Sequence, residues 1–515
     1  MCGACGQAAR GAWVRSTRWS DRAATSRVRA SVFLRSRTAA MSDPFSDLNA
    51  ALEAENLLAV SNACRELVRT GPELGGRWGE VANAALIAGD DLSALAAARK
   101  LAEALPDHVD SWLWVASAHT ALGQLDAALA VLQGQARRFP ATGALHRRMG
   151  RAHLDLGQPA QAEQAFTAAL RLNPSDALAW EGLAHCKTFV RGDDDLADME
   201  QLRLNWPKEA GPDQRGVLSY AIAKAYEDLG EHETAGRRVA EGAAFFREAA
   251  PFDVDRHEAG VDHILKVYDA RFAEANEEAG ALDARPVFIL APPRAGADWL
   301  TRVFSACDGA AGLARGNACF WSAASPLGDH RPEDLLAAFR AGGANILADV
   351  GRTYLSRLTE RAGQAASRVI DPSSLLEMAG GAAGLCLPAA KFIRITRDPR
   401  DAAWSIYRHR FVKGRHWSYH PDDIARVLAC HNRLCDRWAH LFQDRFMTVA
   451  YEDLAADPKT VGGKVARFAG LDAETAASEA WLTADRLNDE PVGVHERGGS
   501  RFDAVEAALA RAGLV

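Results

Sequence analysis

Residues 286–300 read PVFILAPPRAGADWL, and this stretch decides the fold of the second half of the chain. Its first five residues form an apolar run rich in β-formers, which predicts a buried parallel strand. A tight glycine-containing turn follows, and the next residues have helical spacing. A strand, a turn and a helix in this order bind phosphate well, because the helix start offers N–H groups and the positive end of its dipole. The candidate anion-binding residues are therefore Arg294, Ala295, Gly296, Ala297, Asp298 and Trp299.

A second candidate anion site lies in KFIRITRDPRDAAWSIYRHRF, residues 391–411. Its first six residues predict another buried strand, and Arg397 follows at the edge where open α/β sheets bind ligands. Pro399 favours a helix start, and Ser405 lies within that helix. Arg397 and Ser405 are thus placed to hold one phosphate from two sides. Alternatively, the RDPRD segment is a salt-bridge cluster that caps the helix.

Composition and charge describe a soluble globular protein of two or three domains. The chain has 515 residues, of which 48% are hydrophobic and 25% charged. A net charge of -7 gives no reason to expect nucleic-acid binding. No apolar run reaches the ~18 residues of a membrane span, and residues 378–390 predict a buried helix and turn. Nine scattered cysteines favour a reducing cytoplasm over a disulfide framework.

The sequence predicts no metal site. Cys2 and Cys5 form a CxxC pair without the second pair that a zinc site needs. His257 and His263 flank Glu258, but six residues separate the two histidines where a zinc helix places them four apart. The absence of the GxxxxGK[ST] loop also disfavours an ordinary ATPase or GTPase.

Residues 1–45 are predicted to be a disordered extension. The first 40 residues contain eight arginines, no lysine and one acid, Asp21. This composition fits a transit peptide, which is arginine-rich and poor in acids. It also fits an upstream start codon, with Met41 as the natural first residue.

Residues 46–250 repeat with a period of 34 and predict a helical array. A glycine that ends the first helix of each pair recurs with this step, as do an alanine where two helices approach and a proline that closes the unit. The marker positions are Gly89, Gly123 and Gly157, then Ala94, Ala128 and Ala162, then Pro72, Pro106, Pro140 and Pro174. The pattern resembles the tetratricopeptide repeat. The concave face of such an array docks a peptide or protein partner, or the array is a spacer that stabilises the next domain.

The two anion elements together resemble the sulfotransferase superfamily, in the bacterial form that carries tetratricopeptide repeats. The predicted fold is thus a helical solenoid (46–250), a helical connector (251–285) and a P-loop-like α/β domain with a central parallel sheet (286–515). VAYEDLAADP, residues 449–458, also matches a family segment. The resemblance implies 3′-phosphoadenosine 5′-phosphosulfate (PAPS) as donor, with no metal.

The resemblance also implies a role for each site residue. The first loop would hold the 5′-phosphosulfate, with Arg294 stabilising charge on the transferred group. Arg397 and Ser405 would hold the 3′-phosphate, and Tyr451 would flank the adenine. The acceptor would be a small molecule, glycan or peptide, bound by loops within 309–368.

The first loop departs from the family pattern, which reads P-R/K-S-G-T-T. Alanine or aspartate stands at all three hydroxyl positions, and Asp298 would cap the following helix but repel an anion. A family Gly-Glu pair that supplies the base is matched by Gly316 and Asn317, and His330, Glu333 or Asp334 are possible substitutes. The D-K-x-P segment has no counterpart lysine in IDPSSLLEM, residues 370–378. Two hypotheses follow: a PAPS-dependent sulfotransferase, or an impaired sulfotransferase-fold scaffold that acts through its repeats.

Overall fold

The structure is a computed structural model that describes residues 44–54, 56–207, 211–276, 279–313, 320, 323, 332–372, 376–411, 415–472, 474 and 491–515. Side chains are described over the same ranges, except for residue 44, residues 332–344 and 376, and several positions from 497 to 501. Residues 44–515 form one compact unit. No helix in these ranges is both long and apolar enough to span a membrane.

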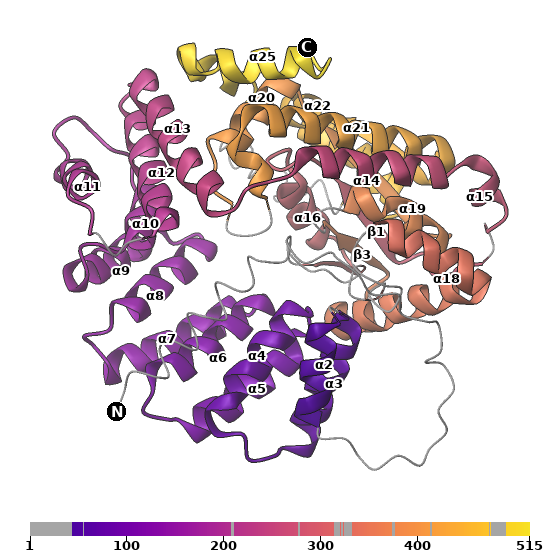
Figure 1. The fold of residues 1–515 in the computed structure, drawn as a ribbon, viewed down its shortest axis with the longest axis horizontal. Helices are drawn as coiled ribbons and strands as arrows, with labels where there is room; N and C mark the ends of the chain where they lie inside the picture. The colour runs from indigo at the N-terminus through magenta and orange to yellow at the C-terminus, as the bar shows by residue number, and fades with distance from the viewer. Residues whose placement is uncertain are drawn as a thin grey trace. The chain divides into compact units, whose positions relative to one another are not determined.

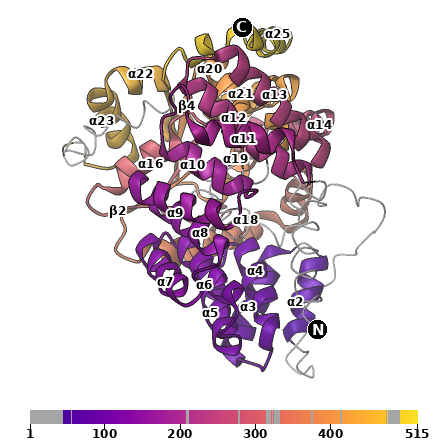
Figure 2. The same ribbon diagram turned by 90° about the vertical axis from the view of Figure 1, so that its left-hand side faces the viewer.

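The first part of this unit is a succession of antiparallel helix pairs (Figure 1). Figure 2 shows the successive helices stacked in chain order from α4 to α12. The helices are α2 (Pro44–Glu53), α3 (Leu57–Thr70), α4 (Trp78–Ile87), α5 (Asp91–Ala104), α6 (Val109–Ala121), α7 (Leu125–Arg138), α8 (Gly143–Asp155), α9 (Pro159–Leu172), α10 (Ala177–Cys186), α11 (Asp194–Leu204), α12 (Pro212–Asp228) and α13 (His232–Ala249), with a short 3-10 turn η1 (Gly75–Arg77).

The repeat markers have the structural roles that the sequence predicts. Gly89, Gly123 and Gly157 each have a positive φ, between 68° and 74°, and each follows the first helix of a pair. The marker alanines 94, 128 and 162 are fully buried between helices. A ring nitrogen at one repeat position also bonds the carbonyl of the closing proline six residues earlier, in Trp112, His146 and Trp180. These bonds fix the turn between successive units.

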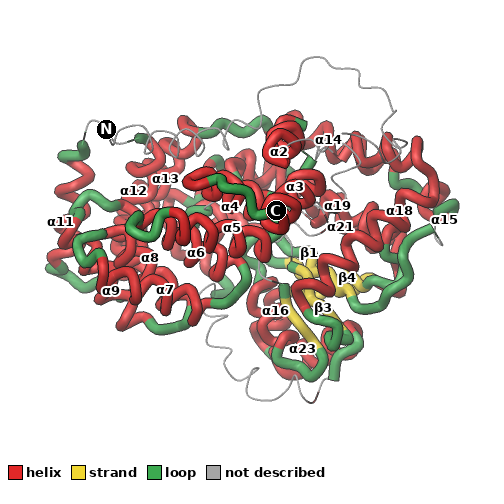
Figure 3. Tube along the Cα trace, turned by 90° about the horizontal axis from the view of Figure 1, so that it is seen from below, coloured by secondary structure: helices red, strands yellow, loops and turns green. Residues whose placement is uncertain are grey.

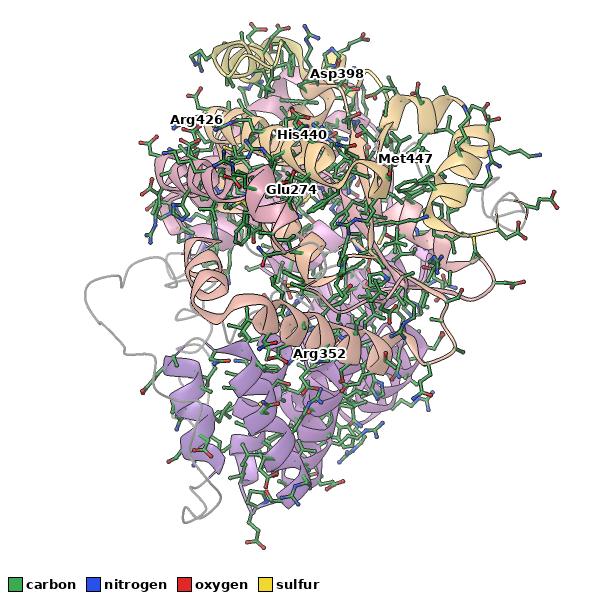
Figure 4. The ribbon with its side chains drawn as sticks, turned by 90° about the vertical axis from the view of Figure 1, so that its right-hand side faces the viewer. Glu274, Arg352, Asp398, Arg426, His440 and Met447 are labelled. Carbon is green, nitrogen blue, oxygen red and sulfur yellow. The ribbon has the colours of Figure 1, made fainter. Side chains whose placement is uncertain are left out.

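A helical connector leads into the α/β domain, through α14 (Val254–Val267) and α15 (Ala270–Glu274). Arg426, labelled in Figure 4, ties this connector to the domain through Glu258 and Asp255. The domain contains β1 (Pro286–Leu290), α16 (Ala297–Ser305), β2 (Ala310–Gly312), α18 (Pro332–Ala362), β3 (Arg368–Asp371), α19 (Leu376–Cys386), β4 (Lys391–Thr396), α20 (Pro399–Tyr407), η3 (His416–Tyr419), α21 (Pro421–Phe442), η4 (Gln443–Arg445), β5 (Phe446–Ala450), α22 (Tyr451–Ala456), α23 (Pro458–Ala469), η6 (Val494–Arg501) and α25 (Asp503–Arg511).

The five described strands form one parallel sheet in the order β2-β3-β1-β4-β5. Strand β1 pairs Val287 with Lys391 of β4 and Pro286 with Val369 of β3. The chain leaves β1 toward the β2 edge and leaves β4 toward the β5 edge. Such a reversal creates a crevice at the carboxyl ends of the two neighbouring strands, where open α/β sheets bind ligands. Both predicted anion loops begin at this crevice.

Helices cover both faces of the sheet (Figure 3). Alternate residues of β1 point to opposite faces: Phe288 packs with residues of α14, α18, α19 and α21, whereas Val287 and Ile289 pack with residues of α16, α22 and α23. Since both faces are buried, the strands are apolar throughout, as parallel sheets require. The continuous apolar runs at 286–290 and 391–396 are explained by this burial.

The last array helices pack directly against the α/β domain. Tyr220 of α12 donates a hydrogen bond to the Tyr407 carbonyl at 3.0 Å, and Phe246 of α13 stacks on Tyr419 with 4.7 Å between ring centroids. One hydrophobic cluster contains side chains of α12, α13, α20, α21 and α25. A second contact region joins the first repeats to α18, where Arg361 pairs with Asp91 at 3.0 Å. Array and domain therefore share a core.

Candidate functional site

The loop after β1 presents main-chain groups to the crevice. Arg294 has φ 66° and is the one non-glycine residue in the described ranges with φ in the left-handed region, and Gly296 has φ 86°. A left-handed non-glycine residue costs about 1–3 kcal/mol and is found mostly where function fixes the backbone. Two left-handed residues so close together turn the chain sharply into α16, whose first-turn amides have no partner within the helix. These amides and the helix dipole can hold an anion.

The side chains of this loop divide into two groups. Ala295, Ala297 and Trp299 are buried in the core beside the sheet, so only their main chain is available to a ligand. Arg294 is half-buried and Asp298 is exposed. The prediction that Asp298 caps the helix is wrong: the N-cap is Gly296, and Asp298 lies two residues further, in the first turn. The left-handed turn at Gly296 starts the helix two residues too early for the aspartate to cap it.

Arg397 joins the two anion loops. One of its terminal nitrogens donates to the Arg294 carbonyl at 2.5 Å and lies 3.3 Å from the Ser405 hydroxyl, while the other donates to the Pro491 carbonyl at 3.2 Å. Its guanidinium also stacks over the ring of Tyr451, 4.6 Å from the centroid. The structure thus places the Arg294 carbonyl, the Ser405 hydroxyl and the Tyr451 ring around the Arg397 guanidinium. Ser405 is completely buried, so a phosphate here would be desolvated.

The remaining residues of RDPRD have structural roles. Asp398, labelled in Figure 4, caps α20 by accepting hydrogen bonds from the amides of Arg400 and Asp401. Arg400 pairs with Glu506 of α25 at 3.3 Å. The helix-capping interpretation therefore holds for Asp398, whereas Arg397 turns back to the loop after β1.

Asp401 holds a C-terminal loop against the site, and sequence reasoning missed it. Its carboxylate accepts from the amides of Gly493 and His495 at 2.7 and 3.1 Å and contacts the His495 ring at 2.6 Å. Burial alone would raise the pKa of Asp401, but the hydrogen bonds from His495 and Gly493 outweigh it and lower the pKa. Asp401 is therefore an anion that fixes the segment beside Pro491.

Two histidines near Arg294 were also missed. His185 comes from α10 of the array, and His409 follows α20 in the α/β domain. Burial, followed by the charges of Arg294 and His185, lowers the pKa of His409 well below its ordinary value. For His185, burial and several cations including Arg294 outweigh Glu181 and lower the pKa. His185 is nevertheless exposed to solvent, as is typical of a side chain on the wall of a concave surface.

Several residues named as candidates lie outside the described residues. These are Gly316, Asn317 and His330, together with Cys2 and Cys5. The side chains of Glu333 and Asp334 also lie outside the description. Glu258, which lies between the two histidines considered for zinc, forms an ion pair with Arg426 at 2.5 Å.

Two family models match separate stretches of this chain. Residues 286–475 match a model of the sulfotransferase family, and residues 147–186 match a tetratricopeptide repeat model. An uncharacterized protein of Aquifex aeolicus is 21% identical over 356 residues, which cover 67% of this chain and 46% of that protein. The chain thus matches less than half the length of this relative.

Two solved structures share limited similarity with this chain. The sulfotransferase domain of the Synechococcus PCC 7002 olefin synthase is 18% identical, covering 45% of this chain and 94% of that one, with a TM-score of 0.30. A tetratricopeptide repeat protein of Parabacteroides merdae is 16% identical, covering 41% of this chain and 93% of that one, also with a TM-score of 0.30.

Proposed function

We propose that this chain, whose residues 286–475 form a sulfotransferase family domain, transfers a sulfuryl group from PAPS to a hydroxyl or amine acceptor. The observation that carries the proposal is the contact of Arg397 with the Arg294 carbonyl and the Ser405 hydroxyl at the crevice of the sheet. These groups lie where an open α/β sheet binds a nucleotide. Their chemistry, a guanidinium beside a hydroxyl and a helix start, suits phosphate oxygens.

The residues fit the donor in two places. Arg397, Ser405 and the start of α20 would hold the 3′-phosphate, and the Tyr451 ring that stacks on Arg397 would flank the adenine. The amides that start α16 and the Arg294 guanidinium would hold the 5′-phosphosulfate. The donor supplies an activated sulfuryl group, and the chain contributes positioning and charge stabilisation. Bisphosphoadenosine would be the second product.

The tetratricopeptide repeats would dock a protein or peptide partner, or the acceptor itself, on their concave face. We expect the protein to work in a reducing compartment such as the cytoplasm, since the described cysteines are free thiols.

A titration calorimetry experiment tests donor binding. Adenosine 3′,5′-bisphosphate should bind more tightly than adenosine 5′-monophosphate, because Arg397 and Ser405 address the 3′-phosphate. Arg397→Ala should weaken bisphosphate binding by about 2 kcal/mol or more, the cost of a desolvated charge-assisted contact. Arg433→Ala is the matched control, since Arg433 pairs with Asp262 on the surface of the same domain. Equal affinities for the two nucleotides would refute the assignment.

A second function is favoured by the buried Ala295 and Ala297, which leave the first loop without hydroxyl groups. The chain would then be a scaffold that binds a partner through its repeats and no longer transfers sulfate. Release of radiolabelled sulfate from the donor, measured with the bisphosphate-binding protein, separates the two. A scaffold binds the nucleotide without releasing sulfate above the uncatalysed rate.

A further inference from the structure

Helix α10 of the array carries a side-chain row that faces the end of α20. Glu181 receives two hydrogen bonds from Arg410, at 2.5 and 2.6 Å, and both side chains are largely buried. His185 lies four residues after Glu181, so both project from the same face of α10. His409 immediately precedes Arg410. The bidentate pair therefore holds His185 beside the segment that follows α20.

Further contacts fix this arrangement. Arg408 pairs with Glu227 of α12 at 3.1 Å, and the Tyr407 carbonyl accepts from Tyr220 of the same helix. Helices α10 and α12 of the array thus contact the residues at and just after the end of α20. Ser405 lies in the last turn of α20, next to these residues, and it contacts Arg397, which reaches the Arg294 carbonyl. The array and the candidate donor site are therefore linked through one short helix.

Three carboxylates near this edge of the sheet have partners within the protein, and the first loop adds the exposed Asp298. Asp371, at the end of β3, is buried and accepts a hydrogen bond from Tyr354 at 2.9 Å. Asp401 holds the C-terminal loop, and Glu452 accepts from the Asp398 amide at 2.8 Å. None of these three acids is exposed enough to meet an acceptor arriving from solvent.

The two histidines differ from these acids. Within the part of the chain that the structure describes, the His185 ring makes no hydrogen bond or ion pair, and it is exposed. His409 is half-buried and packs edge-on against Phe411, with 5.1 Å between centroids. An acceptor can reach the exposed ring more readily than the half-buried one.

We propose that His185, contributed by the repeat array, is the general base that accepts the proton of the acceptor, so that the array completes the active site. This inference rests on the proposed sulfotransferase function. The proton passes from the acceptor hydroxyl to a ring nitrogen of His185, and the acceptor oxygen forms a new bond to sulfur. The bond between sulfur and the bridging oxygen of the donor phosphate breaks, and its electron pair leaves with the bisphosphate.

The charges around the ring support this role. Burial and cations lower the pKa of His185, so the ring is neutral and able to accept a proton at physiological pH. An anionic donor at Arg294 would offset part of that positive field and make His185 a stronger base once the donor is bound. The charged and titratable groups that act on the two rings are Glu181, Lys224, Arg151, Arg294, Arg408 and Arg410.

Labelling with diethyl pyrocarbonate, which reacts with neutral imidazole, tests the position of His185 without turnover. The modification of each histidine is followed by peptide mass spectrometry from pH 5 to 8, with and without saturating adenosine 3′,5′-bisphosphate. His185 should react at lower pH than His108, an exposed histidine at the start of α6 that serves as the matched control. The bisphosphate should slow the labelling of His185 at least about fivefold, or raise its apparent pKa, and leave His108 unchanged.

Sulfate release from PAPS to water supplies the second measurement. His185→Gln should slow release at least about tenfold, toward the 10²–10⁴ range of general-base catalysis, with bisphosphate affinity unchanged within about twofold. His108→Gln should have no effect. The inference is overturned if bound bisphosphate does not change the labelling rate or the apparent pKa of His185. It is also overturned if Asp298→Asn abolishes sulfate release while His185→Gln releases sulfate at the wild-type rate. Failure of the bisphosphate to bind would instead refute the donor site itself.

Discussion

The ion pair between Glu181 and Arg410 should couple the array to the α/β domain more strongly than a surface pair does. Its side chains are 15% and 13% exposed, and two hydrogen bonds join them. Glu181→Gln would leave the Arg410 charge uncompensated among other cations. Breaking a buried ion pair costs about 3–5 kcal/mol of unfolding free energy. Because both side chains of this pair keep some exposure to solvent, we expect a cost near the lower limit, about 3 kcal/mol. The pair between Arg433 and Asp262, 49% and 50% exposed, should contribute about 0–1 kcal/mol.

Two double-mutant cycles measure the difference. Glu181→Gln and Arg410→Gln form one cycle, and Asp262→Asn with Arg433→Gln form the control cycle. Urea unfolding followed by tryptophan fluorescence gives the free energy of unfolding of each variant, and the coupling energy of each pair follows from its cycle. A coupling energy for the array pair no larger than that of the control pair would show that Glu181 does not hold Arg410. It would also remove the constraint that places His185.

Two further outcomes follow from the loops of the candidate site. Asp298→Thr should strengthen bisphosphate binding roughly threefold to tenfold at low ionic strength and by little at high salt, because it removes an exposed negative charge near the helix start; an unchanged affinity in calorimetry would mean that Asp298 points away from the ligand. Asp401→Asn should lower stability by about 2 kcal/mol at pH 7, because charge-assisted hydrogen bonds to His495 and Gly493 are lost. The folded pKa of Asp401 is lowered, so the extra stability of the wild type over Asp401→Asn is complete above the unfolded pKa and is lost as pH falls through the folded pKa. Melting temperatures that differ between the two proteins by the same amount at pH 3 and pH 7 would contradict the assignment.

The elements that follow local rules could be predicted from the sequence. The strands at 286–290 and 391–396 have the predicted bounds, because runs buried on both faces of a parallel sheet are continuously apolar. Pro399 occupies the first turn of α20, where its fixed φ suits a helix start. The repeat glycines adopt the predicted left-handed conformation at the end of each first helix. In each case the signal lies within a few residues.

Contacts between distant segments could not be predicted in this way. Glu181 and Arg410 are 229 residues apart, and Arg397 is 94 residues from Pro491. Nothing in a single sequence pairs one arginine with one glutamate when the chain has 67 acidic residues. Asp298 shows the limit of local rules as well. Aspartate favours the N-cap, yet the backbone turn at Gly296 sets where α16 begins.

Helix α20 links the repeat array to the candidate anion site through its last turn. Ser405 lies in its last turn and contacts Arg397, and the residues just after that turn, Arg408 and Arg410, pair with Glu227 and Glu181 of the array. Arg410 comes five residues after Ser405, so a shift of the array would act on the backbone next to a candidate phosphate ligand. A partner bound on the concave face could thus change donor affinity without touching the donor. A passive spacer would need only the apolar contacts of α12 and α13, and would not require two partly buried arginine-glutamate pairs directly after the helix that carries Ser405.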